Sequence, residues 1–301
     1  MISPILSFQN LYSNNFKNNR QHQVVFQGRD LLKLTQLGIT KKVRSAVQNN
    51  NNIIGSGGEG VVYRIPNTDY CVKITGKDIL HFGNWNMDVP IPEKFNHVVA
   101  ISDNGTRIMR IIEGEHLDYI NNPDEVYSLP AESYIGILKQ FTEAKKYGKY
   151  FDISPKNIIY NPKQKTLTAI DFTVEESFDY DEFMPLSLLF KAMRDETQTI
   201  STSKRNRQLI ARLLQVALDS IHKGGEPEFP ISYNDIDTLL SYGLKILPQG
   251  TSARKFNNLK KNIFEILKLK EDEVQSTEKK IFLSKKIESA KANIDKLFCA
   301  K

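Results

Sequence analysis

The stretch GSGGEGVVYRIPNTDYCVKI, residues 55–74, decides how the rest of the chain is interpreted. Its glycines Gly55, Gly57 and Gly60 have the spacing G-x-G-x-x-G, and β-branched and aromatic residues follow them. Such residues favour strands, and the sequence Pro-Asn-Thr-Asp that comes next is typical of a turn. We therefore predict a glycine turn between two strands, followed by a strand that carries Lys73 in an apolar patch.

The glycine pattern alone has three interpretations. A dinucleotide-binding fold places these glycines between a strand and a helix, whereas the residues after Gly60 favour a strand. A phosphate-binding loop of the Walker type ends in Gly-Lys-Ser/Thr, and Glu59-Gly60-Val61 does not supply that ending. The third interpretation is the glycine-rich lid over nucleotide phosphates in protein kinases, in which Val62 completes G-x-G-x-x-G-x-V. Bare backbone lets N–H groups approach phosphate oxygens closely.

Lys73 follows the lid by one hairpin, where a kinase has the lysine that binds the α- and β-phosphates. A single lysine at this position could also be a strand residue whose ammonium group reaches water. The residues expected to hold the nucleotide are Gly55, Ser56, Gly57, Gly58, Glu59, Gly60, Val62 and Lys73.

The stretch YFDISPKNIIY, residues 150–160, carries the second motif. Asp152 and Asn157 have the D-x-x-x-x-N spacing of the kinase catalytic loop. Asp171, in AIDFT, follows a predicted apolar strand. Either acid alone could be a turn or capping residue. Because the four motifs occur in order, we predict Asp152 and Lys73 as catalytic residues and Asn157 and Asp171 as magnesium ligands.

Composition and patterning predict an α+β fold. The chain has 301 residues, of which 40% are hydrophobic, which suits one large domain or two small ones. Residues 1–28 are rich in Asn, Ser and Gln, and we expect disorder there. The apolar residues of segment 29–48 have helical spacing. The pattern of residues 97–112 predicts a β-hairpin with its turn at Asp103-Asn104-Gly105. Beyond residue 183 nearly everything has helical spacing, and we expect the charged C-terminal helices to pack on the larger part.

Charge, cysteines and hydropathy exclude several classes of protein. Lys and Arg number 41 against 35 Asp and Glu, a net charge of +6, which is too diffuse to predict a nucleic-acid partner. The two cysteines, Cys71 and Cys299, cannot form a disulfide framework or a Cys-based zinc site. No window approaches the ~18 apolar residues of a spanning helix, so we expect no transmembrane segment.

From residues 53 to 190 the chain resembles the protein kinase superfamily. The matching features are GSGGEGVVY, VKI, the hinge-like MRIIEGEHL, FDISPKNIIY and a DFG-like DFT. Within that superfamily it looks most like the compact type III secreted effector kinases of bacterial pathogens, of the OspG/NleH type. The resemblance implies a bilobal fold that binds ATP and Mg²⁺ between a β-rich N-lobe, residues 29–113, and a helical C-lobe, residues 114–301.

The same resemblance implies secretion into the host-cell cytoplasm, where the protein would be a serine/threonine kinase acting on a host protein. The segment 1–28 is compatible with that delivery. The resemblance also implies a ubiquitin-charged conjugating enzyme as a partner, although no residue here specifies one. Two alternatives stay open: a small-molecule phosphotransferase of the aminoglycoside type, and a kinase-fold binding module without catalysis.

Several positions depart from the kinase pattern. Tyr150-Phe151 replaces the usual His-Arg, so we predict activity that needs no phosphorylated activation segment. Ser154 and Thr173 replace the usual lysine and glycine, and Lys156 could partly replace the missing charge. No Ala-Pro-Glu follows, so we expect a short or absent activation segment. Glu93 is the favoured partner of Lys73, although Asp78 and Asp88 are rivals.

Overall fold

A computed structural model describes residues 31–57, 60–75, 81–120, 123–174, 183–194, 196, 200–222, 229–248, 250–271 and 277–299. The predicted N-terminal segment, residues 1–28, lies outside these residues. Gly58, Glu59 and residues 175–182 also lie outside them.

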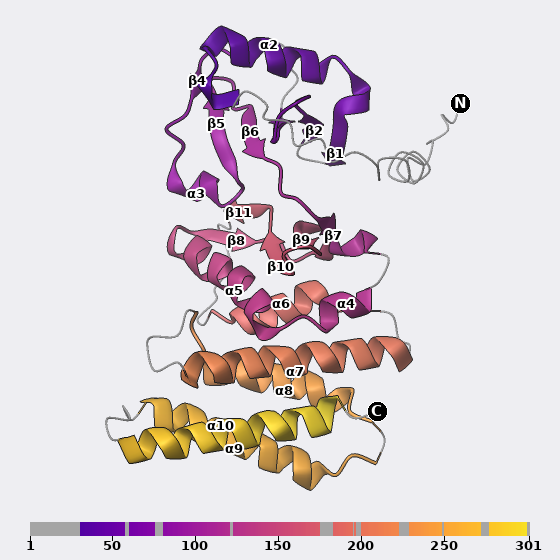
Figure 1. Ribbon diagram of the computed structural model, residues 1–301, viewed down its shortest axis with the longest axis vertical. Coiled ribbons are helices and arrows are strands. Elements are labelled where there is room, and N and C mark those ends of the chain that lie inside the picture. The colour runs from indigo at the N-terminus through magenta and orange to yellow at the C-terminus, as the bar shows by residue number, and fades with distance from the viewer. Residues whose placement is uncertain are drawn as a thin grey trace, which may run out of the picture. The chain divides into compact units, whose positions relative to one another are not determined.

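The fold is mixed α+β, as predicted, with helices and an antiparallel sheet of six strands (Figure 1). The order of strands in that sheet is β1-β2-β3-β6-β5-β4. By its internal contacts the chain divides into two compact units. The N-terminal unit runs to Trp85 and includes Ser102–Thr106, and the C-terminal unit contains Asn86–Ile101 and everything from Arg107 onward.

The N-terminal unit begins with a helix that covers most of the predicted segment 29–48. Its elements are the 3₁₀ turn η1 Leu31–Lys33, α2 Gln36–Val47, η2 Asn50–Asn52, β1 Ile53–Gly57, β2 Gly60–Arg64 and β3 Tyr70–Ile74, with β4 Trp85–Asn86 at its boundary. Thr35 caps α2 by accepting a hydrogen bond from the Gly38 N–H at 3.2 Å, as short hydroxyl side chains do at helix starts. The predicted turn joins β2 to β3, and Asn67 lies in it with φ 60°.

Trp85 belongs to the core of the N-terminal unit. It is 3% exposed. Its backbone N–H donates to Gln36 Oε1 at 2.7 Å, and Gln36 Nε2 donates to the Trp85 carbonyl at 2.8 Å. The indole Nε1 donates to Thr40 Oγ1 at 3.1 Å. These hydrogen bonds therefore hold α2 against β4.

The C-terminal unit contains the remaining elements. Its strands are β5 Val98–Ser102, β6 Arg107–Arg110, β7 Glu115–His116, β8 Lys149–Phe151, β9 Ile158–Asn161, β10 Thr166–Ala169 and β11 Phe172–Val174. The last residue of β5, Ser102, belongs to the N-terminal unit. Its α-helices are α3 Ile91–Lys94, α4 Pro123–Tyr127, α5 Ala131–Lys146, α6 Pro185–Met193, α7 Ile200–His222, α8 Tyr233–Lys245, α9 Ala253–Glu271 and α10 Thr277–Phe298. Two 3₁₀ turns, η3 Leu117–Tyr119 and η4 Pro155–Asn157, complete it.

One apolar core runs through the helices of this unit. The buried face of α5 has the helical spacing Tyr134, Ile137, Leu138, Phe141 and Ala144. The helix α7 packs against α5 and α10, and α10 packs against α9 (Figure 1). The predicted packing role of the C-terminal helices is confirmed, because both α9 and α10 contribute side chains to this core.

Most predicted elements occur where expected, but β4 and three short strands of the C-terminal unit were not predicted. The hairpin of β5 and β6 turns at the predicted residues, where Gly105 has φ 82°. The missed strands β7, β8 and β11 have two or three residues each.

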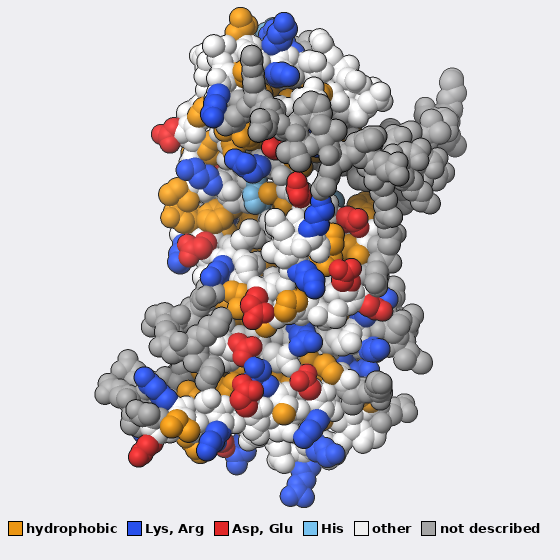
Figure 2. Space-filling model, viewed as in Figure 1, with side chains coloured by type: hydrophobic (Ala, Val, Ile, Leu, Met, Phe, Trp, Pro, Cys, Tyr) orange, Lys and Arg blue, Asp and Glu red, His pale blue; other side chains and the backbone are white. Residues whose placement is uncertain are grey.

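Acidic and basic side chains are interspersed over the visible face of the C-terminal helices (Figure 2). Among the helices in the described part of the chain, none has the length and hydropathy needed to cross a membrane.

Candidate active site

The loop that carries Asp152 leaves the buried strand β8 of the C-terminal unit. Phe151 is paired with Phe172 of β11 in an antiparallel ladder. The Phe151 ring also stacks on Phe141 of α5, with centroids 4.8 Å apart. Apolar packing thus fixes the residue before Asp152, while Asp152 itself is exposed. The carboxylate is therefore accessible to a ligand from solvent.

Asn157 is held directly against Asp152. It is 5% exposed, and its Nδ2 donates to Asp152 Oδ2 at 2.9 Å and to the Asp152 carbonyl at 3.1 Å. Its backbone N–H closes the η4 turn onto the Ser154 carbonyl at 3.0 Å. With the amide nitrogen committed to Asp152, the amide oxygen is the end of this side chain left to bind a cation.

Asp171 adjoins the same loop. The Asp152 N–H donates to the Asp171 carbonyl at 3.3 Å, and the Ile170 N–H donates to the Asn157 carbonyl at 2.8 Å. The structure therefore brings together all three polar residues predicted in this unit. The strand β10 ends at Ala169, so Asp171 lies in the connection to β11. Its φ of 65° is a left-handed conformation that Asp tolerates better than most side chains.

Two residues that the sequence did not indicate form hydrogen bonds with the backbone on either side of Asp171. Asn96 Oδ1 accepts from the Phe172 N–H at 2.6 Å, and Asn96 Nδ2 donates to the Phe172 carbonyl at 2.8 Å. His97 Nε2 donates to the Ala169 carbonyl at 3.3 Å. Burial lowers the pKa of His97, since desolvation disfavours the imidazolium. No motif marks Asn96 or His97, because their partners lie more than 70 residues away.

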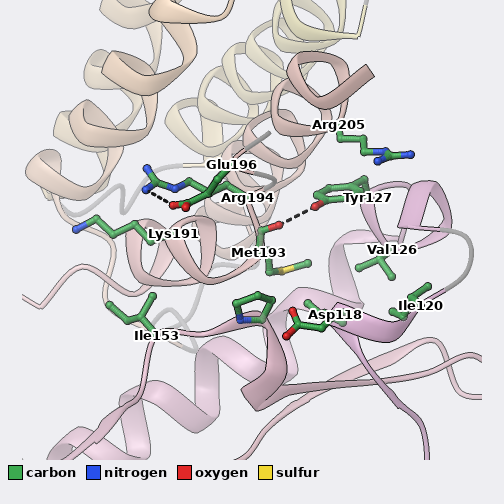
Figure 3. Close-up of a pocket in the computed structure, with 12 residues that line it drawn as sticks. Asp118, Ile120, Val126, Tyr127, Ile153, Lys191, Met193, Arg194, Glu196 and Arg205 are labelled. Atoms are coloured by element: carbon green, nitrogen blue, oxygen red, sulfur yellow. Dashed lines mark hydrogen bonds and ion pairs between the residues drawn. The ribbon is translucent and has the colours of Figure 1, made fainter. Parts of the chain in front are cut away.

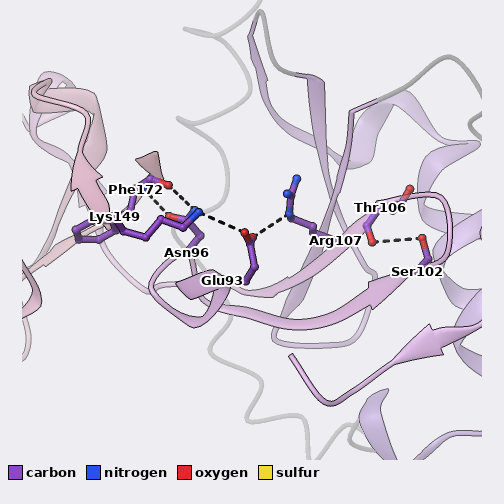
Figure 4. Close-up of polar contacts among 7 residues, drawn as sticks. All are labelled: Glu93, Asn96, Ser102, Thr106, Arg107, Lys149 and Phe172. Carbon is purple, nitrogen blue, oxygen red and sulfur yellow. Dashed lines mark hydrogen bonds and ion pairs between the residues drawn. The ribbon is translucent and has the colours of Figure 1, made fainter. Parts of the chain in front are cut away.

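Glu93 pairs with two cations within the C-terminal unit (Figure 4). Its Oε1 lies 3.3 Å from Lys149 Nζ, and its Oε2 lies 3.1 Å from Arg107 Nε. The Lys149 side chain is only 9% exposed, so the carboxylate compensates a buried charge. Glu93 lies on α3, which is a single turn of four residues. The predicted pair of Glu93 with Lys73 joins two units and stays a prediction.

The glycine motif forms the predicted strand–turn–strand in the N-terminal unit. The strand register pairs Gly55 with Val62, and Val62 with Lys73. Directly opposed residues of an antiparallel sheet share a face, so these three form one row across β1, β2 and β3. The opposite face carries the buried pair Tyr63 and Val72. The row thus places the bare backbone of Gly55, an apolar side chain and an ammonium group on one half-buried surface.

Two other predicted residues lie beside this row, and two fall outside the description. Ser56 is paired with Val61, and Gly57 with Gly60. Gly58 and Glu59 lie outside the described residues. Because a strand follows Gly60, this loop lacks the helix that the dinucleotide and Walker interpretations both require.

The two glycines at the ends of the motif have different structural causes. A Cβ on Gly60 would lie 2.1 Å from the Ile74 carbonyl oxygen, and Gly60 has φ 137°, so the fold itself needs glycine there. A Cβ on Gly55 would meet nothing closer than Val62 Cβ at 3.8 Å. The fold therefore tolerates a side chain at Gly55, and its bareness suits the close approach of a ligand.

The oxygen donors at the junction of Asp152, Asn157 and Asp171 fit magnesium, which prefers carboxylate and carbonyl oxygens and keeps several waters. The described residues contain no group of three or more His, Cys, Asp and Glu side chains that could hold a metal ion. A site with Asp171 and the Asn157 amide needs no such cluster, because phosphates and water supply the other ligands of magnesium in nucleotide sites.

Lys156 belongs to the loop between Asp152 and Asn157. Lys156 is exposed, and its carbonyl accepts a hydrogen bond from His116 Nδ1 at 2.5 Å. This bond joins the loop to β7. The segment in which an activation loop would begin, residues 175–182, lies outside the described residues, so its predicted shortness stays a prediction.

Comparison of the chain with models of known protein families and with curated proteins found no match. The kinase resemblance therefore depends on the motifs quoted above. The glycine motif and Lys73 lie in the N-terminal unit, and Asp152, Asn157 and Asp171 lie in the C-terminal unit.

Proposed function

We propose that this chain is an ATP-dependent serine/threonine protein kinase of bacterial origin, a virulence effector secreted into the host-cell cytoplasm, where it phosphorylates a host protein. The observation that carries the chemistry is the junction of Asp152, Asn157 and Asp171, in which hydrogen bonds join the loop of Asp152 and Asn157 to the start of β11. The secretion and the host location come from the resemblance alone. On the same basis, a ubiquitin-charged conjugating enzyme is a candidate partner.

Each residue has a separate task in the proposed reaction. Asp152 would accept the proton of the substrate hydroxyl, and its exposure leaves room for that hydroxyl. Asn157 and Asp171 would bind Mg²⁺, and Lys73 would neutralise phosphate charge. Bound ATP would supply the transferable phosphoryl group, and catalysis in this class is chiefly positioning and charge neutralisation.

We further propose that the chain adopts the bilobal arrangement of kinases, with residues 29–113 as N-lobe and 114–301 as C-lobe. This arrangement would bring Lys73 and the glycine motif to the acidic junction. The row of Gly55, Val62 and Lys73 supports this, because the lid and the phosphate-binding lysine of a kinase also lie on one face of neighbouring strands.

Calorimetry of ATP binding in the presence of Mg²⁺ tests the nucleotide site. We expect binding by the natural protein, weaker binding by Lys73→Met and a loss of metal-dependent binding by Asp171→Asn. The matched controls Lys42→Met and Glu143→Gln remove the same charges from exposed positions and should bind as the natural protein does. Absence of binding, or equal binding by all five proteins, would refute the proposal.

A transfer assay separates protein kinase from small-molecule phosphotransferase. Radiolabelled ATP is offered with myelin basic protein or with a panel of aminoglycosides. We expect label in the protein and none in the aminoglycosides. Phosphoproteomics of host lysate treated with the natural protein and with Asp152→Ala would then identify the substrate. The unphosphorylated protein should be active as purified, because no arginine precedes Asp152 to bind a phosphorylated activation segment.

A further inference from the structure

A pocket of about 650 Å³ opens in the C-terminal unit beside the loop of Asp152 (Figure 3). Ile153 and Pro155, which line it, belong to that loop. Its other walls come from η3, α4, the end of α6 and the start of α7. Because Ile153 directly follows Asp152, a chain whose hydroxyl reaches Asp152 could extend into this pocket.

One part of the pocket lining is apolar, within a lining that also carries charged side chains. Val126 and Met193 are 2% and 3% exposed. The Tyr127 hydroxyl donates to the Met193 carbonyl at 2.7 Å, which holds α4 against the end of α6. Ile153 lies on the opposite wall and is 39% exposed. Such a surface gains free energy by removing apolar side chains of a ligand from water.

The charged side chains of the lining are three cations, Lys191, Arg194 and Arg205, and two acids, Asp118 and Glu196. In Figure 3 the Lys191 ammonium group points away from the pocket. Arg194 pairs with Glu196 at 2.8 Å, and the Arg205 guanidinium, which points away from the pocket, pairs with Asp124 at 2.6 Å. In Figure 3 the Asp118 carboxylate lies below Met193 and is directed into the pocket. In the described part of the chain, Asp118 takes part in no ion pair.

We propose that this pocket binds the protein substrate through a segment in which an apolar side chain stands next to a lysine or arginine. The apolar side chain packs on Ile153, which is the exposed apolar residue of the lining, and the cation pairs with Asp118. The long aliphatic stem of a lysine or arginine suits an apolar wall that ends in a carboxylate. This inference rests on the proposed kinase function, for which it specifies the class of substrate.

Selection from a randomised seven-residue peptide library, bound to purified protein without ATP, tests the inference. We expect the natural protein to enrich Lys or Arg adjacent to Leu, Ile, Met or Phe. Asp118→Lys should reverse the preference to Asp or Glu, with about a fivefold change for each sign of charge. The control Glu143→Lys makes the same charge change outside the pocket and should keep the natural preference.

Two results would overturn the inference: no enriched motif, or a motif that Asp118→Lys leaves unchanged. Enrichment of acidic residues by the natural protein would also overturn it, because the pocket would then act through its cationic rim. Intrinsic ATP turnover, measured on the same proteins, tests the kinase function separately. We expect Asp118→Lys to retain that turnover and Asp171→Asn to lose it while still binding the peptides.

Discussion

Gly55 and Gly60 belong to one motif but are required for different reasons. The backbone at Gly60 passes the Ile74 carbonyl so closely that only glycine fits, whereas Gly55 has ordinary van der Waals space around it. Gly60 is therefore a structural glycine, and Gly55 is a candidate ligand-binding glycine.

We predict opposite effects of alanine at these two positions. Gly60→Ala should lower the free energy of unfolding by about 3 kcal/mol, because a steric clash adds to a strained φ. Gly55→Ala should change it by less than about 0.5 kcal/mol but weaken ATP binding several-fold, because the methyl group would occupy the space of a phosphate oxygen. Denaturant unfolding and calorimetry measure the two effects. Unchanged ATP affinity in a folded Gly55→Ala protein would argue against the lid.

His97 makes stability depend on pH in a defined direction. Its folded pKa lies below the ordinary value of 6.5 because the ring is buried, so the unfolded chain takes up the proton first. The stability that the neutral, buried His97 ring contributes to the folded state is present above about pH 6.5. It is lost as the pH falls toward the folded pKa, because protonation then favours the unfolded chain. Between pH 7.5 and 5.5 the natural protein should therefore lose more stability than His97→Asn, a variant that tolerates the φ of 59°. Equal losses in urea unfolding would contradict this.

At the scale of elements, α6 depends on a buried cap supplied by α8. Asp235 is 0% exposed. Its carboxylate accepts from the Leu186 N–H at 2.9 Å, from the Ser187 N–H at 2.8 Å and from the Ser187 hydroxyl at 2.5 Å. It therefore satisfies N–H groups that the first turn of a helix leaves without partners, and its charge favours the N-terminal end of the helix dipole.

Asp235→Ala should cost about 3 kcal/mol of stability, because buried donors of α6 lose a charged acceptor. Asp235→Asn keeps one acceptor oxygen and should cost less. Glu288→Ala, which removes an acid that is 64% exposed on α10, should cost below about 1 kcal/mol. Thermal and urea unfolding of the three variants give the comparison. A loss for Asp235→Ala no larger than that for Glu288→Ala would refute the capping role.

At the scale of the whole molecule, the charged C-terminal helices are part of the main core. Five side chains of α10 are buried, namely Ile287, Ala290, Ile294, Leu297 and Phe298. A Cβ on Gly243 of α8 would lie 2.6 Å from the Phe298 ring. The helix α10 is therefore fitted closely to its neighbours, and its mixed charges belong to its exposed face.

A chain shortened to end at residue 271 should lose cooperative unfolding and aggregate, because the apolar surfaces that α10 covers on α7 and α9 become exposed. A chain shortened only by residues 300 and 301 is the control. Circular dichroism and size-exclusion chromatography follow the result. A truncated chain that remains monomeric and melts within a few degrees of the control would show that α10 is dispensable.

Local signals in the sequence were sufficient for most elements and for the motif positions. The turn at Asn67, the hairpin at Gly105 and the helices from α6 to α10 follow from turn chemistry and apolar periodicity, which act between near neighbours in the chain. The spacing of Asp152 and Asn157 likewise predicted two side chains that prove to be hydrogen-bonded. That spacing is local, because both residues lie on one short loop.

Long-range packing decided what the sequence could not indicate. The strands β8 and β11 are too short to show a pattern and exist because they pair with each other. The partners of Glu93, the support of Phe172 by Asn96 and the core position of Trp85 all depend on residues far apart in the chain. A buried polar group takes whichever partner the fold brings near. Tertiary structure alone determines that choice.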